Sequence, residues 1–163
     1  MIIDDSLKKD KDIVMAAVTT YGPSLEYADD SLKKDKDIVM TAVAQSGEAL
    51  EYADLSLRGD LEVVLTAVDD STSAFQYASE SLRTDKESTL KVTKEEPLSM
   101  AFASDELKKD KNFVLEVLDQ SWDSYGAFQH VDHSLKSDEE VVLKAIDSSS
   151  SAFKYADSSL SRP

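Results

Sequence analysis

The sequence predicts an all-α protein, an α-solenoid of about six stacked two-helix repeats of about 25 residues. The first observation behind this prediction is a leucine that returns at a fixed spacing. It stands at Leu7, Leu32, Leu57, Leu82, Leu107, Leu135 and Leu160, each 25 residues after the last except for one step of 28. Residues 1–163 are therefore expected to form a single array of units beginning near 7, 32, 57, 82, 107 and 135, with partial units at both ends.

An aspartate stands three residues after each of these leucines but the last, and it directly precedes an apolar run. A carboxylate at this place caps a helix, because it accepts hydrogen bonds from free backbone N–H groups and meets the positive end of the helix dipole. The expected structural caps are Asp10, Asp35, Asp60, Asp85, Asp110 and Asp138.

The helix after each cap carries an apolar stripe wider than one contact surface requires, so we expect it to be covered from two sides. In the second unit the stripe consists of Ile38, Val39, Ala42 and Val43, with Met40 beside it. Gly47 and its equivalent Gly22 are expected to end this helix in the left-handed conformation.

A second helix is expected through Ala49, Leu50, Tyr52 and Ala53, followed by a short polar turn to the next cap. The small residues Ala49 and Ala53 let neighbouring backbones approach closely. Neither helix reaches the roughly 12 to 15 residues at which isolated helices become marginal in water, so stacking of the units must supply the stability.

The fourth unit departs from the pattern, because Ser88, Thr89 and Thr93 replace apolar residues of the stripe. A buried hydroxyl without a partner is costly, which predicts a frayed or shifted helix here. The alternative is a site that a partner completes.

The two ends also depart from it. Ile2 and Ile3 hold the places of Tyr27 and Ala28, and Pro163 stands where a cap is expected. This indicates either a part of a longer array or an end surface that docks on a partner or on another copy.

The fifth unit contains three extra residues within residues 119–126, and with them the one tryptophan of the sequence. Trp122 and Tyr125 stand in a loop that elsewhere consists of Ser, Asp and Gly. Because both side chains bury a large area with little loss of rotamer entropy, they are the candidate interface residues. The alternative is a tryptophan folded back on its own helices.

Both histidines follow in the same unit. His130 and His133 are expected on one helical face, but two histidines without a third ligand at a matching spacing indicate no metal site. We interpret His130 as a replacement in a column of packing aromatic residues.

The composition narrows the range of partners. The chain has 33 acidic and 18 basic side chains and a formal net charge of -15, which disfavours nucleic acids and anionic lipid surfaces. Cysteine is absent, and no apolar run is long enough to insert into a membrane. We expect a soluble chain inside a cell or an organelle rather than a secreted one, in a compartment that the sequence does not name.

Catalysis is not expected. The capping aspartates recur at equivalent places and do not converge on one substrate. The sequence has no glycine-rich phosphate loop, no GxSxG motif, no cysteine nucleophile and no twelve-residue calcium loop. We therefore expect no catalytic residue, no cofactor and no metal.

The unit, Leu-Lys-x-Asp-Lys-x-x-Val-Leu/Met-x-Ala-Val followed by Ala-Leu-x-Tyr-Ala, resembles the repeat of the family called domain of unknown function 4116. Copies at Leu7, Leu32, Leu57 and Leu135 match closely, the copy at Leu107 carries the insertion, and the copy at Leu82 is degenerate. The resemblance implies a helical tandem array with an interaction role, and it carries over no catalytic residue.

The expected function is a scaffold that mediates protein–protein interaction through a partner with a basic or apolar surface. The alternative is a constitutive soluble accessory or linker subunit of a large multiprotein assembly. One form of this alternative places the subunit at the periphery of a membrane complex.

Overall fold

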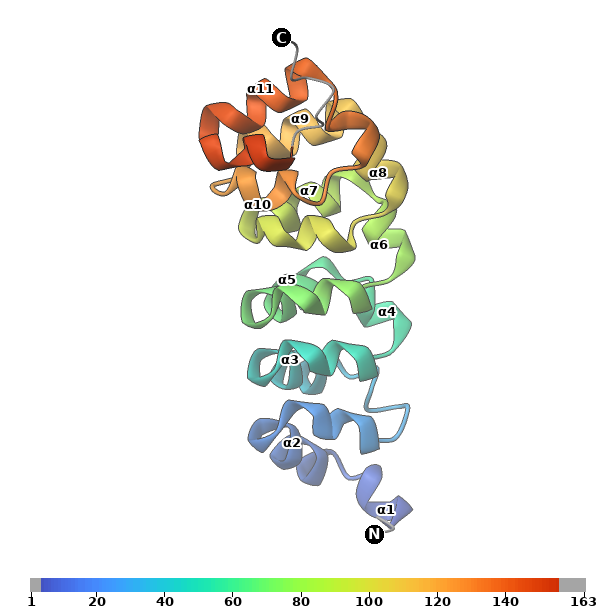
Figure 1. Ribbon diagram of the computed structural model, residues 1–163. Coiled ribbons are helices and arrows are strands. Elements are labelled where there is room, and N and C mark those ends of the chain that lie inside the picture. The colour runs from blue at the N-terminus through green and yellow to red at the C-terminus, as the bar shows by residue number, and fades with distance from the viewer. Residues whose placement is uncertain (1–3, 156–163) are drawn as a thin grey trace. The chain divides into compact units, whose positions relative to one another are not determined.

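The computed structural model describes residues 4–155, and within that range the chain is helical without a strand (Figure 1). The all-α prediction is confirmed. Contacts divide the chain into two compact units, residues 1–82 and 83–163, and each is described by itself. The expectations about Ile2, Ile3, Leu160 and Pro163 lie outside the described residues.

The first unit contains three long helices with shorter ones between them. Its elements are α1 (Asp5–Lys8), α2 (Lys11–Thr20), η1 (Gly22–Tyr27), α3 (Lys36–Gln45), η2 (Gly47–Tyr52), α4 (Leu55–Arg58), α5 (Leu61–Asp70) and η3 (Thr72–Tyr77), where η denotes a 3-10 helix. The helix α6 (Glu80–Thr84) spans the boundary between the units.

The second unit follows the same order, except that two of its elements change type. Its elements are α7 (Lys86–Glu95), η4 (Pro97–Phe102), α8 (Asp105–Lys109), α9 (Lys111–Gln120), α10 (Ser124–Phe128), η5 (His133–Leu135), α11 (Glu139–Ser148) and η6 (Ser150–Tyr155). One is η5, a 3-10 helix at the place of the short α-helices α4, α6 and α8. The other is α10, an α-helix at the place where the other repeats have a 3-10 helix.

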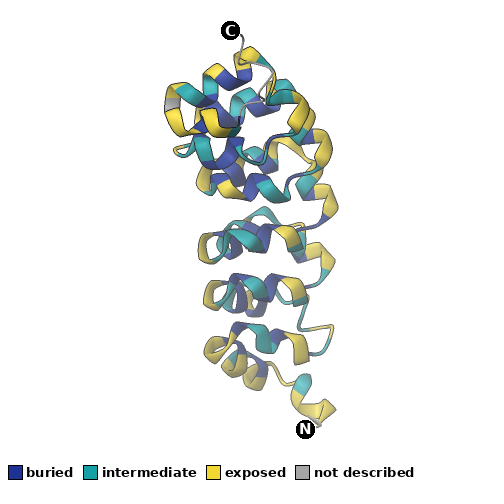
Figure 2. Ribbon diagram, viewed as in Figure 1, coloured by how far each residue is buried: buried dark blue, intermediate teal, exposed yellow. Residues whose placement is uncertain are grey.

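The long helices are α2, α3, α5, α7, α9 and α11, each of 10 residues. In the first unit α3 packs against α2 and also against α5. Accordingly Ile38, Val39, Ala42 and Val43 are all completely buried, and in Figure 2 the dark blue of buried residues recurs along α3 and α5.

The equivalent of Ile38 in α2 shows which neighbour covers this position. Ile13 is 44% exposed, whereas Ile38 and Val63 are fully buried. Because α2 has no long helix before it in the described part of the chain, the preceding repeat must be what covers Ile38 and Val63.

The repeat contains three helical segments rather than the predicted two. Its second helix is a 3-10 helix, in which Ala49 N–H donates to the carbonyl of Ser46 (2.9 Å) and Ala53 N–H to that of Leu50 (3.2 Å). Residues three apart share an edge of such a helix, so Leu50 and Ala53 both face the interior, where both are buried.

In most repeats the predicted polar turn is a short helix, and the leucine that recurs about every 25 residues lies in it. Leu57, Leu82 and Leu107 are buried in α4, α6 and α8. A backbone hydrogen bond joins each turn to the turn of the repeat before it. The donors and acceptors are Asp29 to Lys8, Asp54 to Lys33, Ser79 to Arg58, Ser104 to Arg83 and Asp132 to Lys108, at 2.8–3.2 Å.

The prediction for Gly22 and Gly47 is wrong, because no residue from 4 to 155 has a positive φ. The long helix ends instead at an extended residue, Ser46, with φ -158°. Glycine is required by a close approach between repeats, since a Cβ at Gly47 would overlap the carbonyl oxygen of Ala67 in α5. The same approach lets Gly47 N–H donate to the Asp70 carboxylate at 2.7 Å.

The expectation that the fourth long helix is frayed or shifted is also wrong. The helix α7 has the full 10 residues and a capping Asp85. The hydroxyl of the buried Thr93 donates to the carbonyl of Thr89 at 3.0 Å, so the helix backbone satisfies it. A different hydroxyl is orphaned: Ser99 Oγ is buried and has no hydrogen-bond partner within the described part of the chain.

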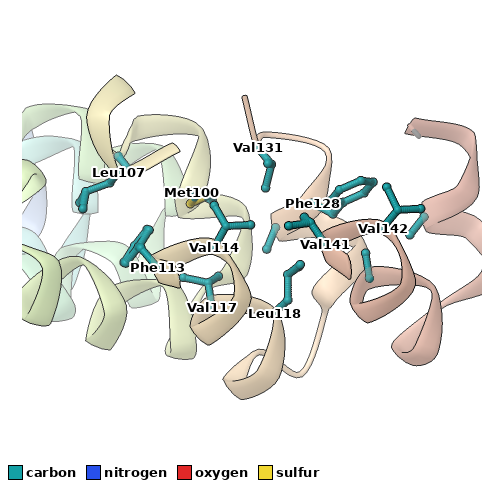
Figure 3. Packing of buried hydrophobic residues seen from close by; sticks show 14 residues of the cluster. Met100, Leu107, Phe113, Val114, Val117, Leu118, Phe128, Val131, Val141 and Val142 are labelled. Atoms are coloured by element: carbon teal, nitrogen blue, oxygen red, sulfur yellow. The ribbon is translucent and has the colours of Figure 1, made fainter. Parts of the chain in front are cut away.

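The second unit has a core to which η4, α8, α9, α10, α11 and η6 all contribute buried side chains. Met100 of η4, Phe113 of α9, Phe128 of α10 and Val141 of α11 are all completely buried. Figure 3 shows these side chains, with their apolar neighbours, gathered in one interior.

The glycine contact gives a first prediction. Gly47→Ala should lower the free energy of unfolding by about 2 kcal/mol or more, because the new methyl group forces α5 away from η2. Chemical denaturation monitored by circular dichroism measures this change.

Gly59→Ala is the matched control. A Cβ at Gly59 would come closest to the Ser79 hydroxyl, at 3.1 Å, and would lie 3.6 Å from the carbonyl oxygens of Leu55 and Ser56, so it would overlap no backbone atom. Its effect should stay within about 1 kcal/mol. Equal effects of the two substitutions would contradict the conclusion that the close approach of the Ala67 carbonyl requires glycine at position 47.

Candidate protein-interaction surface

The capping aspartates lie one at the N-terminus of each long helix. In α3, Asp35 Oδ1 accepts from the N–H groups of Asp37 (3.1 Å) and Ile38 (3.4 Å). Asp10, Asp60 and Asp138 make the same two contacts, whereas Asp85 and Asp110 each accept from one backbone N–H group, that of the residue three positions on. Each aspartate caps a different helix, so the capping contacts within a unit do not bring two of these carboxylates together.

Three of the caps also bind a lysine from the repeat before them. Lys11 donates to Asp35 at 2.6 Å, Lys36 to Asp60 at 2.8 Å, and Lys111 to Asp138 at 2.9 Å. In each case the hydrogen bond from the lysine is the main reason that the pKa of the carboxyl lies below its ordinary value of 3.8. Burial opposes this effect and is smaller.

These lowered pKa values predict an acid dependence of stability. A carboxyl whose pKa is depressed in the folded state stabilises the fold above its unfolded pKa and loses that contribution as the pH falls through the folded value. The free energy of unfolding should therefore fall between about pH 5 and pH 2.

The variant that combines Asp35→Asn, Asp60→Asn and Asp138→Asn isolates the charge, because asparagine caps helices as well as aspartate does. Its stability at neutral pH should be lower, and its loss on acidification smaller, than those of the wild type. Asp69→Asn, on the exposed side of α5, is the control. If the triple variant loses as much unfolding free energy on acidification as the wild type, the role of the lysine contacts is contradicted.

The insertion places Trp122 on the surface. Its side chain is 74% exposed, and its indole N–H donates to the carbonyl of Glu95, at the end of α7, at 3.0 Å. Asp123 caps α10, which begins directly after it, by accepting from Gly126 N–H at 2.9 Å. Trp122 is therefore anchored by its polar atom while most of its ring faces solvent.

Tyr125 has a different environment from Trp122. Its ring is half-buried against the core of the second unit, with its centroid 5.5 Å from that of Tyr155. The two hydroxyl groups are 3.4 Å apart. The structure thus leaves Trp122 available to a partner and engages Tyr125 inside the unit.

The histidines do not share a helical face, contrary to expectation. His130 follows the end of α10, whereas His133 begins η5. Burial, together with the positive charges of Lys108 and Lys136, lowers the pKa of His130. No group of three or more His, Cys, Asp or Glu residues between 4 and 155 is placed to hold a metal ion.

An open groove between α9 and α11, of about 750 Å³, is a feature that sequence reasoning missed. The α9 side provides Leu115, Glu116 and Asp119, and the α11 side provides Glu140, Leu143, Lys144, Ile146 and Asp147. The position of Met40, beside the apolar stripe, was the available signal, since Leu115 and Leu143 are its equivalents. Their distance from each other depends on how far apart the two helices stand, which the pattern of one repeat does not determine.

A second hollow, of about 180 Å³, lies on the side of α2 that no repeat covers in the described chain. Its lining includes Leu7, Ile13, Ala17 and Tyr27. Ile13 and Tyr27 are 44% and 54% exposed, so this apolar surface faces solvent.

The model of the family described as "Domain of unknown function (DUF4116)" matches residues 2–30, 10–58, 60–108 and 110–161. These segments cover most of the chain. The protein belongs to the DUF4116 family. Each of the three longer matches spans two of the repeats described above.

No curated protein and no solved structure matches this DUF4116 chain. None of the helices between residues 4 and 155 combines the length and the apolar character that crossing a membrane requires.

Proposed function

We propose that this DUF4116 protein is a non-catalytic helical-repeat scaffold that binds another protein, and that its repeats stack as an α-solenoid. The packing of successive long helices within each unit supports the stacking. The exposed Trp122 is the observation that carries the binding role.

Trp122 is suited to anchor a partner, because covering its ring costs little free energy. The indole N–H already donates to Glu95, so a partner that covers the ring leaves no donor without an acceptor. Leu98, three residues beyond Glu95, is a second exposed apolar side chain of this unit, at 42%. Tryptophan is enriched among the few residues that dominate interface energies.

The charge of the chain indicates what kind of partner it binds. With a net charge of -15, the surface favours a protein with a basic or apolar face over nucleic acid or an anionic membrane. We propose that binding requires neither a cofactor nor a metal ion.

Substitution of Trp122 tests the proposal against the native partner. Cross-linking mass spectrometry in the source cells identifies proteins in contact with the chain, and the affinity of each is then measured for the purified full-length protein. Trp122→Ala should weaken binding by about tenfold or more while circular dichroism stays unchanged.

Leu55→Ala, at a side chain 65% exposed in the first unit, is the control and should bind normally. An unchanged affinity of the folded Trp122→Ala variant for every partner would refute the anchor role.

The second candidate, a constitutive accessory subunit of a large assembly, is favoured by the uncovered side of α2. Within the described residues this side presents an apolar hollow lined by Leu7, Ile13, Ala17 and Tyr27, the kind of surface that a permanent contact buries. Sedimentation of the isolated chain separates the candidates. A monodisperse chain supports the scaffold, whereas aggregation that Ile13→Gln relieves supports the accessory subunit.

A further inference from the structure

The groove between α9 and α11 has an apolar floor that the other residues between 4 and 155 leave uncovered. Leu143 is 59% exposed, although its equivalents Leu90 and Leu115 are only partly exposed. Ile146 is partly exposed, whereas the equivalent Val43 of α3 is completely buried. A partner would therefore gain hydrophobic free energy by covering this floor.

The rim of the groove is acidic. A smaller hollow continues it toward the N-termini of the two helices and adds Lys111, Asp138 and Glu139 to the lining. Together the two hollows are lined by six acidic and two basic side chains.

Both of these lysines are already engaged by the chain. Lys111 binds Asp138 at 2.9 Å and Glu140 at 2.8 Å, and Lys144 pairs with Asp119. Of the remaining acidic side chains of the lining, Glu116 lies 4.0 Å from Lys86, which is outside the lining. Glu139 and Asp147 are exposed and are not balanced by a further lysine of the lining.

The shape of the groove suits an elongated occupant. The helices α9 and α11 have 10 residues each, a length of roughly 15 Å, which corresponds to about three turns of a partner helix. An apolar floor between acidic edges matches an amphipathic helix with leucine-like anchors at i, i+3, i+4 and i+7 and with Lys or Arg beside them.

We propose that the α9–α11 groove binds a basic amphipathic helix of a protein partner. This inference rests on the proposed scaffold function and assigns to it a second contact, separate from Trp122. The apolar anchors of the helix contact Leu115, Leu143 and Ile146, and its cations face Glu116, Glu139 and Asp147.

Binding of three labelled synthetic helices to the full chain, measured by fluorescence anisotropy, tests the proposal. The probe has Leu at the four anchor positions and Lys beside them. One control helix has Glu in place of each Lys, and the other has Ser in place of each Leu. The probe should bind, more weakly as salt increases, and each control should bind at least about tenfold less tightly.

Matched variants locate the binding. Leu143→Ala combined with Asp147→Asn should weaken the probe by about tenfold or more. Leu65→Ala combined with Asp69→Asn alters the equivalent positions of α5 and should change nothing. Trp122→Ala should leave probe binding intact, because that side chain hydrogen-bonds at the end of α7 and does not line the groove.

The proposal is overturned if the probe fails to bind, if either control helix binds as tightly, or if the two double variants weaken it equally. These outcomes leave the scaffold function standing, since that function is judged on the native partner and on Trp122→Ala. Conversely, groove binding together with full affinity of the Trp122→Ala variant for its native partners would refute the Trp122 anchor alone.

Discussion

The apolar face of each long helix is wider than one neighbour can cover, and the remaining features follow from this constraint. In α3, Ile38 and Ala42 need the repeat before them, while α5 packs on the opposite side. The backbones must then come close enough for Gly47 N–H to reach Asp70. This contact between repeats lies directly after the extended Ser46 that ends α3, since Gly47 is the first residue of η2.

Ion pairs between successive repeats also support the close packing of the long helices. The lysine at the first position of a long helix binds the aspartate that caps the next one, as Lys11 does with Asp35 and Lys36 with Asp60. The cap is therefore shared between its own helix and the neighbouring repeat, so a strongly acidic chain gains attraction where successive helices begin. Lys111 binds Asp138 in the same way, but Leu61 replaces the lysine of α5, and Lys86 of α7 pairs with Glu116, so this series of ion pairs is interrupted at α5 and α7.

Much of the fold could be predicted because its signals are local. Each long helix begins directly after a predicted aspartate, since the cap and the dipole act within one turn. The 3-10 character of η2 could not be predicted, because six residues are too few to separate a period of three from one of 3.6. The role of Gly47 and the α9–α11 groove depend on distances between repeats, which the pattern of one repeat does not contain. Trp122 was predicted as a candidate, but its bond to Glu95 depends on where the end of α7 lies.

Deletion of one whole repeat tests most directly whether the repeats support one another as equivalent neighbours. Removing residues 32–56 joins Ser31 to Leu57 and brings α2 and η1 against α5. Val63 and Ala67 then take the places of Ile38 and Ala42, and Asp70 replaces Gln45 as the acceptor for Gly22 N–H. We predict that the shortened chain keeps its helical signal per residue in far-ultraviolet circular dichroism and unfolds cooperatively at a lower temperature. Loss of that signal throughout the chain, as expected when a segment is cut from a single globular core, would contradict the account.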